Sequence, residues 1–155
     1  MKETTIIFNE EPMALPRPRV NFQTKCLYDE PKSKQYKARL GFLARGIIKN
    51  PLTGPLIVEM KFFQTRPKSR MIKNPVKATD KMKREYTYKM TKPDVDNLVK
   101  MVLDSLNKIA YPDDASVVKI IATKGWTNRK ARTEIYIMEM VDHESNYQYC
   151  LMEDG

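Results

Sequence analysis

Alternating apolar and polar side chains predict the strands of this chain. Between Pro55 and Phe63, every second residue belongs to one apolar set: Leu56, Val58, Met60 and Phe62. This two-residue period is typical of a strand with one buried face. A short run over residues 4–8 and two runs rich in β-branched residues, 116–126 and 133–141, predict three more strands. The last two flank a turn-like segment, so we expect them to form a closing antiparallel hairpin.

Apolar residues spaced three and four apart predict two helices. The first, over residues 33–48, has its apolar stripe at Tyr36, Leu40, Leu43, Ala44 and Ile47. The second, over residues 94–110, has its stripe at Val95, Leu98, Met101, Val102, Leu106 and Ile109. On the second helix, Asp96, Lys100 and Asp104 follow one another four residues apart, so they stack on the side roughly opposite the stripe. Burial of the stripe would turn this polar row outward.

The elements follow in the order strand, helix, strand, helix, strand, strand. This order predicts an α+β fold in which two helices pack on a single mixed sheet. A chain of 155 residues is long enough for one hydrophobic core. We therefore expect one domain over residues 1–141, followed by a polar tail over residues 142–155. Two connections carry basic residues: a proline-rich loop over residues 11–19 and a long loop over residues 64–92.

Most of the positive charge lies in the second loop. The formal net charge is +9, and ten Lys or Arg against two acidic residues between Thr65 and Lys92 leave that segment at +8. Such a concentration favours a polyanionic partner, although a solvated loop without a ligand is the alternative. Seven basic residues of the two loops are our candidates for DNA binding: Arg17, Arg19, Arg66, Lys68, Arg70, Lys73 and Lys92.

Other features narrow the chemistry and the location. His143 is the single histidine, which argues against a histidine-based triad and against a zinc site with several histidines. Cys26 and Cys150 have neither metal-binding nor redox spacing, so we expect two reduced thiols. No apolar run approaches the roughly 20 residues that span a bilayer. We expect a cytoplasmic protein that does not enter a membrane.

Carboxylates flank the second helix. Asp94 and Asp96 lie at its start, and Asp113 and Asp114 follow its other end. A strand that begins near residue 116 could return beside the helix start and carry Asp113 or Asp114 toward the first pair. Carboxylates gathered in this way repel one another unless a cation joins them, and magnesium prefers such oxygen ligands. Lys100 would then offset the charge that develops on a phosphate during hydrolysis.

Each of these features also has an ordinary structural explanation. Asp94 and Asp96 can cap a helix and interact with its dipole, and Lys100 can belong to an exposed ion-paired stripe. Asp113 and Asp114 can form a polar turn. The alternatives to a DNA nuclease are therefore a non-catalytic basic DNA-binding protein and a metal-dependent nuclease that acts on RNA. The joint occurrence of these features, in this order around Lys100, favours the nuclease site.

Three short motifs carry a resemblance to a known family. The runs Lys-Pro-Asp-Val-Asp-Asn-Leu-Val-Lys at 92–100, Asp-Ser-Leu at 104–106 and Asp-Asp-Ala-Ser-Val-Val at 113–118 resemble the RusA family of Holliday junction resolvases. The resemblance implies a RusA-like nuclease domain and a crossover junction endodeoxyribonuclease, active in DNA recombination and repair. It further implies a homodimer that binds four-way DNA junctions and makes paired hydrolytic nicks with Mg²⁺, for which Mn²⁺ can substitute.

The same resemblance implies roles for individual residues. By position, the catalytic set falls on Asp94, Asp96, Lys100 and Asp114. The metal ligands would be Asp94, Asp96 and Asp114, with Asp113 as a further candidate. The long basic loop and the polar tail depart from the compact family pattern, which leaves the preferred DNA structure open. Proteins of this kind often come from phages or prophages, so a bacterial or phage-infected host cytoplasm is the expected setting.

Overall fold

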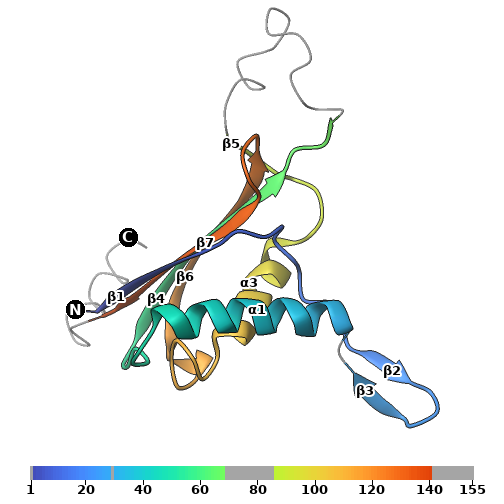
Figure 1. Cartoon of the computed structure of the whole chain (residues 1–155), viewed down its shortest axis with the longest axis horizontal. Helices are drawn as coiled ribbons and strands as arrows, with labels where there is room; N and C mark the ends of the chain where they lie inside the picture. Colours follow the sequence, from blue (N-terminus) through green and yellow to red (C-terminus); the bar gives the residue numbers. More distant parts are fainter. Residues whose placement is uncertain (1, 29, 69–85, 141–155) are drawn as a thin grey trace, which may run out of the picture.

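The protein is described by a computed structural model that covers residues 2–28, 30–68 and 86–140 (Figure 1). Its strands are β1 (Glu3–Phe8), β2 (Arg19–Asn21), β3 (Cys26–Tyr28), β4 (Leu56–Thr65), β5 (Tyr86–Tyr88), β6 (Val117–Thr127) and β7 (Arg132–Glu139). Its helices are α1 (Pro31–Ile47), α3 (Val95–Leu106) and a single 3-10 turn, η2 (Asp114–Ser116). The predicted tail over 142–155 and residues 69–85 of the predicted basic loop lie outside the described residues.

Five strands form one mixed sheet in the order β1-β7-β4-β6-β5. The central strand β4 pairs with β6 in parallel and with β7 in antiparallel orientation, so that Val58 is opposite both Ile120 and Ile137. The α+β class with two helices on a mixed sheet is confirmed. The expected closing hairpin is wrong, because β6 and β7 do not pair with each other but lie on either side of β4. The backbone groups of β4 bond to β6 along one edge and to β7 along the other. The connection between β6 and β7 therefore crosses the end of β4.

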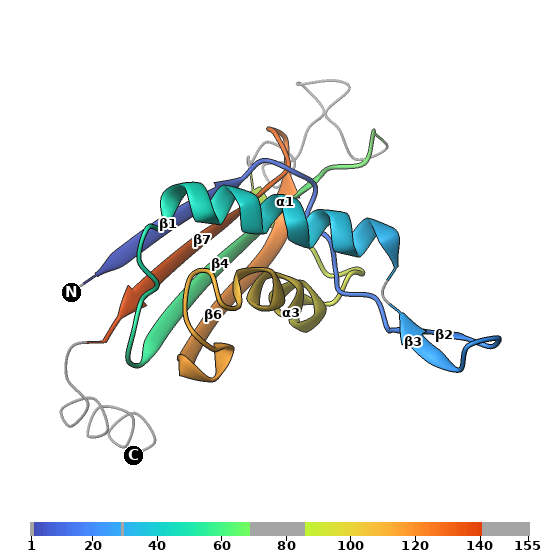
Figure 2. The ribbon, with the colours of Figure 1, turned by 60° about the horizontal axis from the view of Figure 1, so that its bottom comes forward.

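Both helices pack on one face of the sheet (Figure 2). The alternating set predicted for β4 is buried there, and the inward residues of the other elements complete one core with Leu40 of α1, Leu98 of α3 and Ile135 of β7, all fully buried. The two helices approach closely at Gly41, where an added Cβ would lie 3.4 Å from the Ser105 carbonyl oxygen of α3 and 3.0 Å from Ile109 Cδ1, just after that helix. This packing fixes α3, and with it the polar row on its outer side. Within the described residues, no helix has the length and apolar content needed to cross a bilayer.

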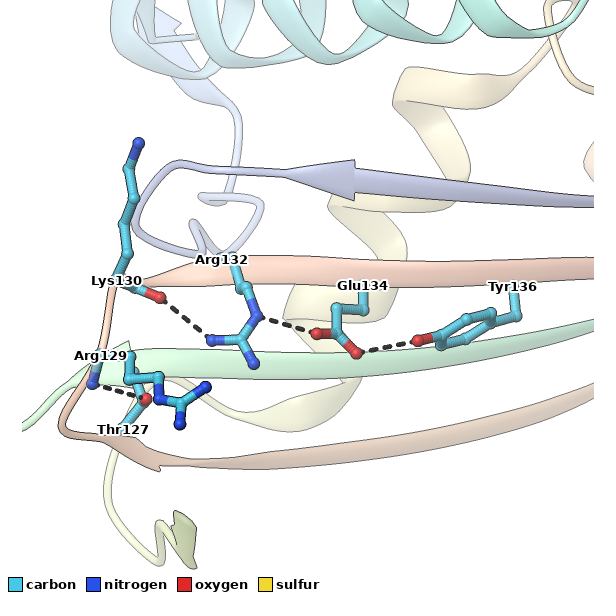
Figure 3. Close-up of polar contacts among 6 residues, drawn as sticks. All are labelled: Thr127, Arg129, Lys130, Arg132, Glu134 and Tyr136. Carbon is cyan, nitrogen blue, oxygen red and sulfur yellow. Dashed lines mark hydrogen bonds and ion pairs between the residues drawn. The ribbon is translucent and has the colours of Figure 1, made fainter. Parts of the chain in front are cut away.

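No helix among the described residues covers the opposite face of the sheet, where polar side chains bond along the strands. Figure 3 shows the row on β7, in which Arg132 Nε donates to Glu134 Oε1 at 2.8 Å and the Tyr136 hydroxyl donates to Glu134 Oε2 at 2.9 Å. The Arg132 guanidinium also stacks 3.9 Å from the centre of the Phe63 ring on β4. Hydrogen bonding and stacking thus link side chains on a face that none of the described helices covers.

Three short strands were not predicted from the apolar pattern. β2 and β3 form a separate two-stranded sheet directly after the proline-rich loop, and β5 pairs with the end of β6 inside the segment expected to be a basic loop. Each is only three residues long, which is too short for a two-residue period to be recognised. The second helix is shorter than expected, because the chain leaves helical geometry at Asn107.

Candidate metal and DNA site

Two lysines hold the loop that leads into α3. Lys124 Nζ, from β6, donates to the carbonyl oxygens of Thr91 at 2.8 Å and Pro93 at 2.6 Å. Lys89 Nζ donates to the carbonyl oxygen of Lys92 and lies 4.7 Å from the centre of the Trp126 ring. Burial lowers the pKa of Lys89, and the nearby charge of Lys124 lowers it further. These contacts position residues 91–93, and therefore Asp94, relative to the sheet.

The first two candidate carboxylates are exposed at the start of α3. Asp94 occupies the N-cap position, but its side chain makes no capping hydrogen bond. Asp96 lies in the first turn and is exposed, where the helix dipole favours a negative group. Capping therefore does not account for the Asp94 side chain, and both carboxylates face solvent.

The polar row of α3 does not form the ion-paired stripe that was the alternative explanation. Among the described residues, Lys100 has no carboxylate within 4.0 Å, although Asp96 and Asp104 lie one turn away on either side. Asp104 instead pairs with Lys37 of α1, with 3.7 Å between Nζ and Oδ2. Lys100 is thus exposed to solvent on the outer side of α3.

A groove of about 320 Å³ runs beside this row. It is lined by residues of the proline-rich loop, α1 and α3: Leu15, Pro16, Arg17, Pro18, Lys37, Asn97, Lys100 and Asp104. The Leu15 N–H donates to the Asn97 carbonyl oxygen at 3.1 Å, which ties the loop to α3. Among the residues that line the groove, three are cationic and one is acidic, and Lys37 is paired with that acidic residue, Asp104. This positive balance favours an anion such as a phosphate.

The second pair of carboxylates lies beyond the other end of α3. Asp113 Oδ1 accepts from the Ala115 N–H at 3.0 Å, and this bond, together with a hydrogen bond to Asp114, lowers the pKa of Asp113. The pKa of Asp114 is raised, chiefly by the hydrogen bond with Asp113, and also by desolvation and by the negative charges of Asp113 and Asp104. Asp113 and Asp114 thus shift each other's pKa, and the charge of Asp104, near the end of α3, contributes to the shift of Asp114.

The expected meeting of Asp114 with Asp94 and Asp96 does not occur within one chain. The 12 residues of α3 span about 18 Å and separate the two pairs. Among the described residues, no three His, Cys, Asp or Glu side chains are grouped so that they could hold a metal ion. The expectation failed because β6 runs antiparallel to α3, so its far end, with Lys124, returns beside the helix start.

The other basic candidates are found in different environments. Arg19 Nη2 forms an ion pair with Glu30 at 2.8 Å. Arg66 is only 4% exposed, and its Nη2 donates to Thr87 Oγ1 at 3.1 Å, which favours a structural role. Lys68 and Lys92 are exposed. Arg70 and Lys73 lie outside the described residues.

Sequence reasoning missed the parts that Lys37, Lys89 and Lys124 play. Lys37 lies away from the apolar stripe of the first helix, and no motif includes it. Lys89 directly follows β5 and Lys124 lies near the far end of β6, and the pairing of these two strands brings both lysines to the loop before Asp94. No local signal in the sequence identifies the contacts of Lys37 and Lys124, because each joins residues more than 30 apart. The bond from Lys89 to Lys92 spans three residues, but it lies in a segment without an apolar period.

Comparison with known proteins agrees with the motif analysis. A family model described as Endodeoxyribonuclease RusA matches residues 9–138. The chain belongs to the RusA family. A Bacillus subtilis (strain 168) protein described as uncharacterized protein YqaN is 34% identical over 133 residues, which cover 84% of this chain and 92% of that protein. Membership in the RusA family implies endodeoxyribonuclease activity, and the match includes every candidate residue from Arg17 to Asp114.

Proposed function

We propose that this RusA-family chain is a Mg²⁺-dependent, structure-selective endonuclease that resolves Holliday junctions by paired hydrolytic nicks. It would act as a homodimer on branched DNA during recombination and repair, in the cytoplasm of a bacterium or a phage-infected host. The observation that carries the proposal is the exposed Asp94 and Asp96 pair, with no capping bond from Asp94, next to a groove that contains Arg17, Lys37 and Lys100.

The residues at the start of α3 fit a magnesium ion. Carboxylate oxygens are the donors that this hard cation prefers, and it commonly uses one or two of them while it keeps water. Asp94 and Asp96 would hold the ion, which supplies polarisation of a phosphoryl oxygen and a lower pKa for bound water. Lys100 would bind the non-bridging oxygens of the phosphate, where negative charge develops. Arg17 and Lys37 would hold the neighbouring backbone in the groove.

Asp114 enters this proposal through the second subunit. Because α3 separates Asp114 from Asp94 and Asp96 in one chain, a site that uses all three carboxylates needs Asp114 from the partner. A two-fold homodimer would then contain two equivalent composite sites, which suits paired cuts in a junction with two-fold symmetry.

Cleavage of a synthetic four-way junction, with and without Mg²⁺ and with a chelator control, tests the activity. Asp96→Asn should abolish cleavage and leave junction binding largely intact, since the lost charge serves the metal. Glu59→Gln, the same type of change on the opposite face of the sheet, should cut like the wild type. Undiminished cutting by Asp96→Asn would exclude the assigned site. Parallel digestion of a linear duplex and an RNA hairpin distinguishes the RNA-directed alternative, and absence of metal-dependent cutting supports the non-catalytic one.

The composite site has a separate test. Asp96→Asn and Asp114→Asn would each inactivate both sites of a homodimer. After the two variants are unfolded and refolded together, a mixed dimer has one site that carries all three aspartates, so nicking of single strands should return. If both substitutions affect the same site within a chain, the mixture stays inactive.

A further inference from the structure

The hairpin formed by β2 and β3, here called the arm (residues 19–28), extends away from the body of the molecule near the start of α1 (Figures 1 and 2). Within the part of the chain that the structure describes, its strands pair only with each other, with Arg19 opposite Tyr28 and Asn21 opposite Cys26. A two-stranded hairpin on its own is marginally stable in water. An arm built in this way gains most from a partner that covers it.

The tip of the arm is ordered and displays an aromatic ring. Asn21 Oδ1 accepts from the N–H groups of Gln23 at 2.9 Å and Thr24 at 3.3 Å, which is a side-chain-stabilised turn. Lys25 takes a left-handed conformation with φ of 54° and completes the reversal. Phe22 lies inside this turn and is 92% exposed. The hydrogen bonds therefore hold the backbone of the turn while the ring remains free to make contacts.

Further apolar side chains continue from the tip along the arm. Val20 and Leu27 are direct cross-strand partners, so their side chains share one face of the hairpin, and they are 48% and 69% exposed. Tyr28, on the other face, is 43% exposed. Single exposed apolar residues are common on soluble proteins, but several of them on one projecting element favour an interaction site.

The point of attachment of the arm favours a polyanion as its partner. On the arm itself Arg19 is paired with Glu30 and Asp29 follows Tyr28 in the sequence, so the cationic excess lies at its base. The arm follows directly from Arg17 and Pro18, which line the cationic groove with Lys37 and Lys100. A backbone bound in the groove would therefore continue toward the arm. Aromatic rings next to basic residues are the usual means of stacking on nucleic-acid bases.

We propose that the arm is the element that recognises a branch point, and that Phe22 stacks on a base exposed where the strands of a junction exchange. The inference rests on the proposed function for its substrate. Bases in a continuous duplex are already stacked and paired, whereas those at a branch are more accessible, so stacking at the tip favours branched over linear DNA. The arm thereby adds selectivity for structure to an interface whose groove contacts only the backbone.

Binding to a four-way junction with 2-aminopurine at the branch, in buffer with all divalent metal chelated, tests the role of Phe22. The wild type should change the 2-aminopurine fluorescence on binding. Phe22→Ala should lose that change and bind the junction about fivefold to a hundredfold more weakly, with its affinity for linear duplex unaltered. Phe42→Ala is the matched control, because Phe42 is 79% exposed on α1, and it should behave like the wild type.

Three results would overturn the inference: unchanged junction affinity of Phe22→Ala, an equal loss for junction and duplex, or an equal effect of Phe42→Ala. A change in the sedimentation of free Phe22→Ala, with unchanged DNA binding, would assign the arm to a second copy of this chain. The assay needs no cleavage. A wild type that shows the Phe22-dependent signal but never cuts would therefore contradict the proposed function while the role of the arm stands.

Discussion

Lys124→Met separates the loop before Asp94 from the sheet while it keeps an apolar side chain of similar length. The substitution removes the two hydrogen bonds from Lys124 Nζ to the carbonyl oxygens of Thr91 and Pro93, at 2.8 and 2.6 Å. Asp94 follows Pro93 directly, so both the stability of the loop and the position of the carboxylate depend on the lysine. We expect a lower free energy of unfolding and a higher Mg²⁺ concentration for half-maximal cleavage.

The magnitude follows from the two bonds and one opposing effect. A hydrogen bond to a charged group contributes about 1.5–3 kcal/mol, and the partial exposure of this site favours the lower end for each bond. Loss of the Lys124 charge relieves its repulsion with Lys89, whose pKa it lowers. The net loss should be about 2 kcal/mol, which corresponds to a decrease of about 4–8 °C in Tm for a domain of this size.

Thermal unfolding followed by circular dichroism measures the first effect, and a magnesium titration of junction cleavage measures the second. Displacement of a residue that orients a metal ligand typically weakens metal binding by about tenfold or more, so half-maximal cleavage should need correspondingly more Mg²⁺. Lys119→Met, the same change at an exposed position of the same strand, should leave both values unaltered. If Lys124→Met unfolds and titrates like the wild type, these bonds do not position Asp94.

Two other substitutions test the groove and the uncovered face of the sheet. Lys37→Ala should lower the slope of log affinity against log salt for junction binding by about one unit, because one phosphate contact is lost; an equal effect of Lys34→Ala, on the same helix but outside the groove, would contradict this. Burial acts to raise the pKa of Glu134, but bonds from Arg132 and Tyr136 and the charge of Lys61 outweigh it and lower the pKa. The ionised Glu134 therefore contributes to the free energy of unfolding at neutral pH, and this contribution is lost as the pH falls through the lowered pKa. Glu134→Gln should reduce the free energy of unfolding by about 1 kcal/mol at pH 7. It should also weaken the dependence of that free energy on pH below about pH 4.5. Urea unfolding at pH 7 and below about pH 4.5 measures the free energy of unfolding. Parallel pH profiles for the variant and the wild type would show that these bonds do not stabilise the ionised Glu134.

The long elements could be predicted because burial of one face imposes a period on the sequence. The alternating run of β4 and the apolar stripe of α3 were both visible in this way. Strand partners were not, since alternation identifies a buried face and carries no information about which strand lies beside it. For this reason β6 and β7 were expected to pair, although β4 lies between them.

The candidate site could be predicted only in its local parts. Spacing alone placed Asp94 and Asp96 at the start of a helix and Lys100 on its outer side. The contribution of Lys37 to the groove depends on how α1 crosses α3, and the hold of Lys124 on the loop depends on where β6 ends. The place of Asp114 depends on the direction of a strand, which no residue pattern in the motif encodes.

The position of β7 has a consequence for how the protein is made. β7 comes last among the described strands, yet it lies inside the sheet and joins β1 to β4, with Glu3 opposite Met138. A growing chain that has not yet released residues 132–139 from the ribosome therefore has β1 without its neighbour and β4 open along one edge. Pairings between such distant segments form slowly. During synthesis, this nuclease presents an open sheet edge to other chains until nearly the whole described sequence has emerged.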